Sequence, residues 1–163
     1  MCLLEQGFRM EANDFGVYIE TVTVYIHDPA VQWFELMGVP VRDYEEGTSY
    51  PFVRFGEVGD LLSAPRKETT LFVFDELMLV PKEYYKVLTK LSVLRRHERV
   101  GIFAGSQRPA NIPREFLSLS NNILVFALHD RDDVSKLKGL LTKEQLESIP
   151  TQKVGEFVEV RLV

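Results

Sequence analysis

The sequence predicts an α/β domain in which a mostly parallel sheet is flanked by helices in three layers. Three short runs are continuously apolar, as strands buried on both faces of a parallel sheet are: residues 71–74, 100–104 and 123–128. From Lys82 onward, apolar residues recur instead at helical spacing. Strands that alternate with helices favour a parallel sheet, whose ligands bind at the carboxyl ends of the strands.

The first half of the chain contains the less regular elements. Residues 17–26 are β-branched and aromatic, which predicts a strand that stops before Asp28. Because Asp28 can cap a helix that Pro29 opens, we expect a short helix through residues 33–36, ended by Gly38. The other elements expected here are a polar loop over residues 43–50, a small strand at Phe52–Phe55 and a helical turn at Val58–Ser63.

The second half contains the most regular helix. The apolar face of this helix, which begins near Lys82, consists of Tyr84, Val87, Leu88, Leu91 and Leu94. Thr142 and Gln145 have the spacing of a capping box, which predicts a short helix after them. Further expected elements are a short segment at residues 114–119, a helix through Val134, Leu137 and Leu140, and a final strand at residues 156–163.

Composition and charge narrow the function classes. The 163 residues are 45% apolar and 26% charged, so we expect residues 1–163 to fold as one domain. A net charge of −5 argues against a protein that coats nucleic acid through bulk charge. Cys2 is the one cysteine, no apolar run is long enough for a membrane helix, and the start does not resemble a secretory signal. We therefore expect a cytoplasmic protein, or an intracellular one encoded by a virus or plasmid.

The strongest chemical signal is the run LFVFDE, in which four apolar residues precede Asp75 and Glu76. At the carboxyl end of a strand, Asp75 could hold Mg²⁺ while Glu76 orients or deprotonates an attacking water. Acids at a strand end also serve solubility or helix capping. The pair alone is compatible with either interpretation.

The order of the following elements gives this pair a context. After it come a long helix, the basic cluster RRHER at residues 95–99, a strand, and the run GSQRP at residues 105–109. In this order the chain resembles the HerA/FtsK family of DNA-pumping ATPases, which are P-loop NTPases of the RecA/ASCE type. The resemblance covers about residues 22–141 and includes Asp28-Pro29 and the acidic helix start at residues 128–133.

The resemblance implies a role for each matching residue. It makes Asp75 the residue that binds Mg²⁺ and the nucleotide cofactor, Glu76 the catalytic base and Gln107 the sensor of the γ-phosphate. Arg96 or Arg99, like Arg95, would reach across a subunit boundary as an arginine finger. A solvated helix end also explains these arginines, because cations are favoured at a helix C-terminus. The implied ligands are Mg²⁺ and ATP, and the implied partners are further copies of the chain or an ATPase subunit, and DNA.

The match breaks at the start of the chain. The family's first strand and its GxxxxGK[ST] loop should precede Val22, yet the sequence has no such motif there or elsewhere. That loop supplies backbone N–H groups and a lysine to the phosphates, so its loss predicts weak ATP binding or none. The missing strand is central in the family's sheet, which is therefore expected to be incomplete at the N-terminus. The first sixteen residues, a rearranged C-terminal strand or a partner chain could fill the gap.

Three functions fit these observations. The first is a degenerate HerA/FtsK-like protein that acts in DNA packaging, transfer or translocation without ATP turnover of its own. The second is an active ATPase completed by the phosphate loop of a partner chain. The third is a Toprim-like, Mg²⁺-dependent nuclease that uses four acids at two strand ends: Asp75, Glu76, Asp130 and Asp132.

The remaining basic residues have simpler interpretations. Three lysines share one face of the predicted long helix: Lys82, Lys86 and Lys90. Their spacing could follow a DNA backbone and is also typical of a solvated helix face. The histidines lack metal-ligand spacing, and we interpret them as loop or capping residues: His27, His97 and His129.

Overall fold

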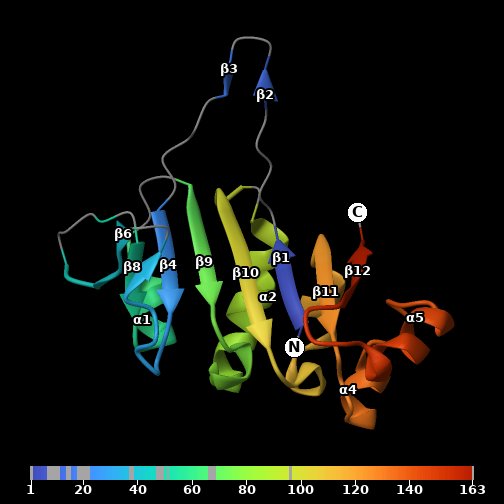
Figure 1. Ribbon diagram of the computed structural model, residues 1–163. Coiled ribbons are helices and arrows are strands. Elements are labelled where there is room, and N and C mark those ends of the chain that lie inside the picture. Colours follow the sequence, from blue (N-terminus) through green and yellow to red (C-terminus); the bar gives the residue numbers. More distant parts are fainter. Residues whose placement is uncertain are drawn as a thin grey trace.

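The computed structural model describes residues 2–6, 12–13, 16–17, 23–36, 39–46, 50, 52–65, 69–95 and 97–162. Its centre is an eight-stranded sheet with the order β12-β11-β1-β10-β9-β4-β8-β7 (Figure 1). In chain order these strands are β1 (Cys2–Gln6), β4 (Thr23–His27), β7 (Arg42–Asp43), β8 (Phe52–Phe55), β9 (Thr70–Phe74), β10 (Val100–Ser106), β11 (Asn122–Phe126) and β12 (Phe157–Arg161).

The sheet is mostly parallel, as the sequence predicts. Parallel pairs join β10, β9, β4, β8 and β7. Because β1 is antiparallel to both β10 and β11, β11 runs in the same direction as β10. Only β1 and β12 run the other way among the eight strands of this sheet.

Helices and small hairpins complete the described fold. The α-helices are α1 (Val58–Ser63), α2 (Tyr85–Leu94), α3 (Arg114–Ser118), α4 (Arg131–Lys136) and α5 (Lys143–Ser148). Short 3₁₀ turns are η1 (Leu77–Leu79), η2 (Lys82–Tyr84), η3 (Pro109–Asn111) and η4 (Ile149–Thr151). Two-residue strands form the hairpins β2 (Ala12–Asn13) with β3 (Gly16–Val17) and β5 (Glu35–Leu36) with β6 (Val39–Pro40). No helix in the described ranges is long and apolar enough to span a membrane.

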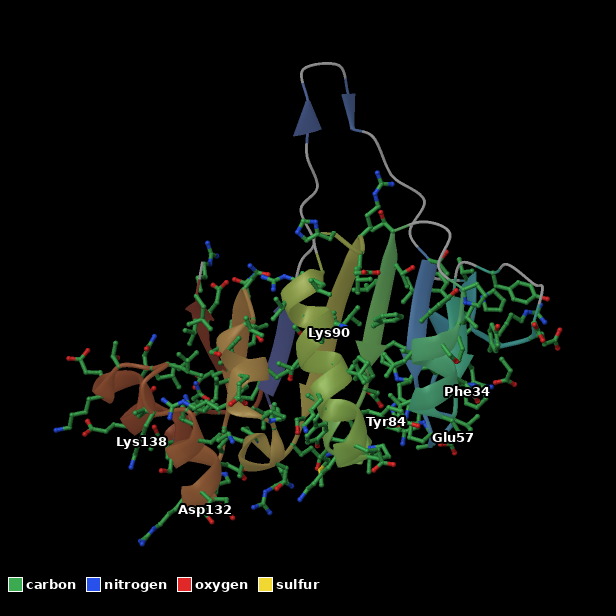
Figure 2. The ribbon with its side chains drawn as sticks, turned by 180° about the vertical axis from the view of Figure 1, so that it is seen from behind. Phe34, Glu57, Tyr84, Lys90, Asp132 and Lys138 are labelled. Carbon is green, nitrogen blue, oxygen red and sulfur yellow. The ribbon has the colours of Figure 1, made fainter. Side chains whose placement is uncertain are left out.

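Alternation along the strands divides the core into two faces. Phe72 and Phe74 of β9 belong to the main core cluster, which also contains the buried residues of α1, α2 and α3. Val73, between them, belongs to a smaller cluster on the other face. Helix α2 lies behind the sheet in Figure 1 and in front of it in Figure 2, on the face of the main cluster. The predicted sheet flanked by helices is confirmed.

The prediction of a helix through residues 33–36 is wrong. The Asp28 carboxylate accepts hydrogen bonds from the backbone N–H groups of Gln32 (2.7 Å) and Trp33 (2.8 Å). Val31 adopts a left-handed conformation with φ of 54°, which a right-handed helix does not tolerate. The segment therefore turns into the β5–β6 hairpin, and Trp33 packs against the smaller core cluster on the second face of the sheet.

Several local predictions are confirmed. Phe52–Phe55 is a strand and Val58–Ser63 a helix, with the predicted bounds. The capping box of α5 forms in both directions, with 2.9 Å from Thr142 N to Gln145 Oε1 and 3.2 Å from Gln145 N to Thr142 Oγ1. Val87, predicted on the apolar face of α2, is instead 48% exposed, because the buried stripe of that helix contains Leu88, Leu91 and Ser92.

The place expected to lack a strand is filled by the chain itself. β1 lies between β10 and β11, with Cys2 opposite Ser106 and Gln6 opposite Ile102. Of the three ways to close the sheet that the sequence left open, the structure takes the N-terminal segment. Because β1 is antiparallel to β10, its own carboxyl end points away from the edge where β9 and β10 end.

Candidate functional site at the carboxyl edge of the sheet

The carboxyl ends of β9 and β10 bring Glu76 and Gln107 together. These strands are parallel, with Phe74 opposite Ala104, so the residues that follow them emerge at the same edge. The Glu76 carboxylate accepts a hydrogen bond from the Gln107 backbone N–H, at 3.2 Å from one oxygen and 3.3 Å from the other. Asp75 is exposed at this edge and Glu76 is half-buried.

The turn after β10 is held by a second set of contacts, to α4. Arg108 Nε lies 2.8 Å from Asp133 Oδ2, and Arg108 Nη2 lies 3.2 Å from Asp130 Oδ2. The other oxygen of Asp133 accepts a hydrogen bond of 2.9 Å from the backbone N–H of Ala110. The Asp133 side chain is 2% exposed, so a buried carboxylate fixes the turn that carries Gln107.

Sequence reasoning did not single out Arg108 or Asp133. The signal was present, since Arg108 belongs to the run GSQRP and Asp133 to the acidic start of α4. Asp130 is the N-cap of α4 and accepts the N–H groups of Asp132 and Asp133 at 2.9 and 3.4 Å. These acids stabilise the helix start and the neighbouring turn.

The geometry does not assemble the acids of a nuclease. Asp130 is engaged by Arg108 and by the N-terminus of α4. Over the ranges that the structure describes, no group of three or more His, Cys, Asp or Glu side chains is placed to hold a metal ion. Among these described residues, Asp75, Glu76, Asp130 and Asp132 do not form the metal-binding group of a Toprim-like site.

Arg99 lies at the opposite edge of the sheet from this site. Its carbonyl oxygen accepts a hydrogen bond of 3.0 Å from the N–H of Thr70, the first residue of β9, whereas Asp75 follows the last. Arg95 is held by the carbonyl of Ser92 at 2.6 Å and by Asn121 at 3.4 Å. Arg96 lies outside the described residues. Within one chain, Arg99 is not brought together with Asp75 or Gln107.

His27 ends β4 at the same edge as Asp75, and its interpretation as a loop or capping residue is wrong. The residue is 3% exposed and stands in register with Phe55 and Phe74, with its ring 6.0 Å from the Phe74 ring. Its Nδ1 atom has no hydrogen-bond partner among the residues described. Burial lowers the pKa of His27 below 6.5, and the nearby carboxylates of Glu57 and Asp28 partly offset this.

This lowered pKa predicts a loss of stability in mild acid. The unfolded chain binds the His27 proton more tightly than the folded chain does. The contribution of His27 to the free energy of unfolding is therefore fully present above pH 6.5, and it falls as the pH drops toward the folded pKa. The slope is at most about 1.4 kcal/mol per pH unit. Urea unfolding between pH 7.5 and 5 should show a shallower pH dependence for His27→Phe than for the wild type. The exposed His97→Gln is the control, and equal slopes in all three proteins would contradict the assignment.

The described edge does not form a cradle for a polyphosphate. Its exposed or half-buried charges are largely acidic: Glu57, Asp75, Glu76 and Asp130. Arg108 is already paired with Asp133 and Asp130. A phosphate loop leaves the carboxyl end of its strand, and the carboxyl end of β1 lies at the other edge of the sheet. The acids described at this edge disfavour the phosphates of ATP, whereas carboxylates such as Asp75 are ligands that suit Mg²⁺.

Comparisons with known proteins identify the fold. Neither a scan against protein-family models nor a search of curated protein sequences finds a match. A solved structure of the genome packaging NTPase B204 from Sulfolobus turreted icosahedral virus 2, in complex with AMPPCP, is similar with a TM-score of 0.67 and 13% identity. A structure of B204 in complex with AMP gives a TM-score of 0.60 and the same identity. In both cases the alignment covers 87% of this chain and 78% of B204. The likeness establishes a P-loop NTPase-like α/β fold.

Proposed function

We propose that this chain is a degenerate HerA/FtsK-like protein that acts as a binding or assembly module in DNA packaging, transfer or translocation, without ATP turnover of its own. The fold that it shares with a viral genome packaging NTPase supports the packaging context. The direction of β1 is the observation that supports the loss of ATP turnover. The strand in the central position ends at the edge away from Asp75 and Gln107, and the sequence has no GxxxxGK[ST] motif.

Isothermal titration calorimetry of the purified chain with ATP, with and without Mg²⁺, tests this function. We expect no binding at micromolar concentrations, because the edge offers acids to the phosphates instead of an anion cradle. The Asp75→Asn/Glu76→Gln double variant, in which two of those charges are removed, should behave the same. A micromolar Kd that Asp75→Asn weakens would contradict the proposal.

A second candidate is an ATPase whose phosphate loop comes from another chain. The hydrogen bond between Glu76 and Gln107, beside the exposed Asp75, is the observation that favours it. In such an assembly, Arg96 and Arg99 would act as arginine fingers toward a neighbouring subunit, since Arg99 is remote from its own edge site. Mg²⁺-dependent hydrolysis that appears on mixing with a P-loop partner and disappears in Glu76→Gln is the expected result. Hydrolysis that is unchanged in Glu76→Gln would exclude a role for this site.

A further inference from the structure

Three exposed lysines form a row along the outer side of η2 and α2, which we call the lysine crest: Lys82, Lys86 and Lys90. Figure 2 looks onto α2 from outside the sheet and shows Lys90 on it. Leu88 and Leu91 of the helix belong to the main core, so Lys86 and Lys90 lie on the opposite, solvent side.

The crest lysines carry uncompensated charge. Among the residues that the structure describes, no ion pair involves Lys82, Lys86 or Lys90. Glu83 is the one acid within residues 82–94, and no contact joins it to the crest. In a protein of net charge −5, this is a local concentration of positive charge.

The crest has the geometry of a polyanion contact. Lys86 and Lys90 lie four residues apart in α2, about 6 Å along the helix, and Lys82 precedes them in the 3₁₀ turn η2. A single small anion could engage only one of them. A chain of phosphates can engage all three, because lysine binds phosphate as a point charge on a flexible stem.

We propose that the lysine crest binds the phosphate backbone of duplex DNA. A convex helix can enter the major groove, which is about 12 Å wide, whereas acidic peptides are bound in grooves or at sheet edges. Val87 and Val93, 48% and 59% exposed, are the apolar side chains exposed beside the lysines. The inference rests on the proposed function for its biological setting, and it names the surface through which that function reaches DNA.

Fluorescence anisotropy with a labelled 20-base-pair duplex, without nucleotide, tests the proposal. The Lys82→Ala/Lys86→Ala/Lys90→Ala variant should bind more weakly, and its plot of log Kobs against log salt should be shallower by about 3 units, since each phosphate contact contributes roughly 0.9. The matched control is Lys138→Ala/Lys143→Ala/Lys153→Ala, which removes three exposed lysines elsewhere and the same charge. This control should keep the wild-type salt slope.

Three outcomes would overturn the inference. They are no binding of the duplex by the wild type at low salt, an equal loss in the two triple variants, and competition by polyglutamate as effective per charge as competition by DNA. Thermal unfolding of both variants shows whether the folded state is retained, and single substitutions of the crest lysines replace the triple variant if it is not. Because the anisotropy assay contains no nucleotide, it measures DNA binding separately from ATP binding. A failure of the DNA-binding inference can therefore be distinguished from a failure of the proposed loss of ATP turnover.

Discussion

Replacing Asp133 with alanine is expected to lower the free energy of unfolding by about 2 kcal/mol. The carboxylate is 2% exposed and holds both the Arg108 side chain and the Ala110 N–H. Its removal leaves the Ala110 N–H without its acceptor, while the Arg108 guanidinium, 47% exposed, keeps its contact to Asp130. Urea unfolding at pH 7 measures the change directly.

Two variants control this prediction. Asp132→Ala alters the exposed neighbour on the same helix and should change stability by no more than about 0.5 kcal/mol. Asp133→Asn keeps the shape of the side chain and an acceptor oxygen. Its loss in the free energy of unfolding should therefore lie between the losses in Asp132→Ala and Asp133→Ala. Amide hydrogen exchange should also quicken at Gln107 and Ala110 in Asp133→Ala, because the turn loses its anchor to α4. A loss in Asp133→Ala as small as that in Asp132→Ala would show that the carboxylate does not hold the turn.

The regular part of the fold could be predicted because its signals are local. The continuous apolar runs become β9, β10 and β11, and Thr142 with Gln145 forms the capping box that its spacing indicates. The meeting of Glu76 with Gln107 also follows from the pattern, since each comes just after a strand and the two strands are parallel neighbours.

Other features depend on contacts that no local pattern encodes. Asp28 and Pro29 are compatible with a helix start, yet the Asp28 carboxylate closes a turn, and the left-handed Val31 prevents the helix. Arg108 and Asp133 are 25 residues apart, and only the packing of α4 against η3 brings them together. The strand β1 pairs with residues about 100 positions later in the chain, and its five residues do not indicate its direction.

The proposed loss of ATP turnover depends on the direction of β1 in the sheet. Because β1 runs antiparallel to β10, it delivers no loop from that central position to Asp75 and Gln107, and the proposed loss of ATP turnover rests on this geometry. If it ran parallel, its carboxyl end would lie beside Gln107, where a phosphate loop belongs.

Disulfide trapping through Cys2, the one cysteine of the sequence, tests this direction most directly. Cys2 is opposite Ser106, and antiparallel partners have Cα atoms about 4.5–5.5 Å apart, within the range of a disulfide. Ile102 is equally buried but four positions away, roughly 13 Å along the strand. Under mild oxidation, Ser106→Cys should form the intramolecular crosslink, seen by mass spectrometry of the digest, and Ile102→Cys should not. A crosslink in Ile102→Cys without one in Ser106→Cys would contradict the account.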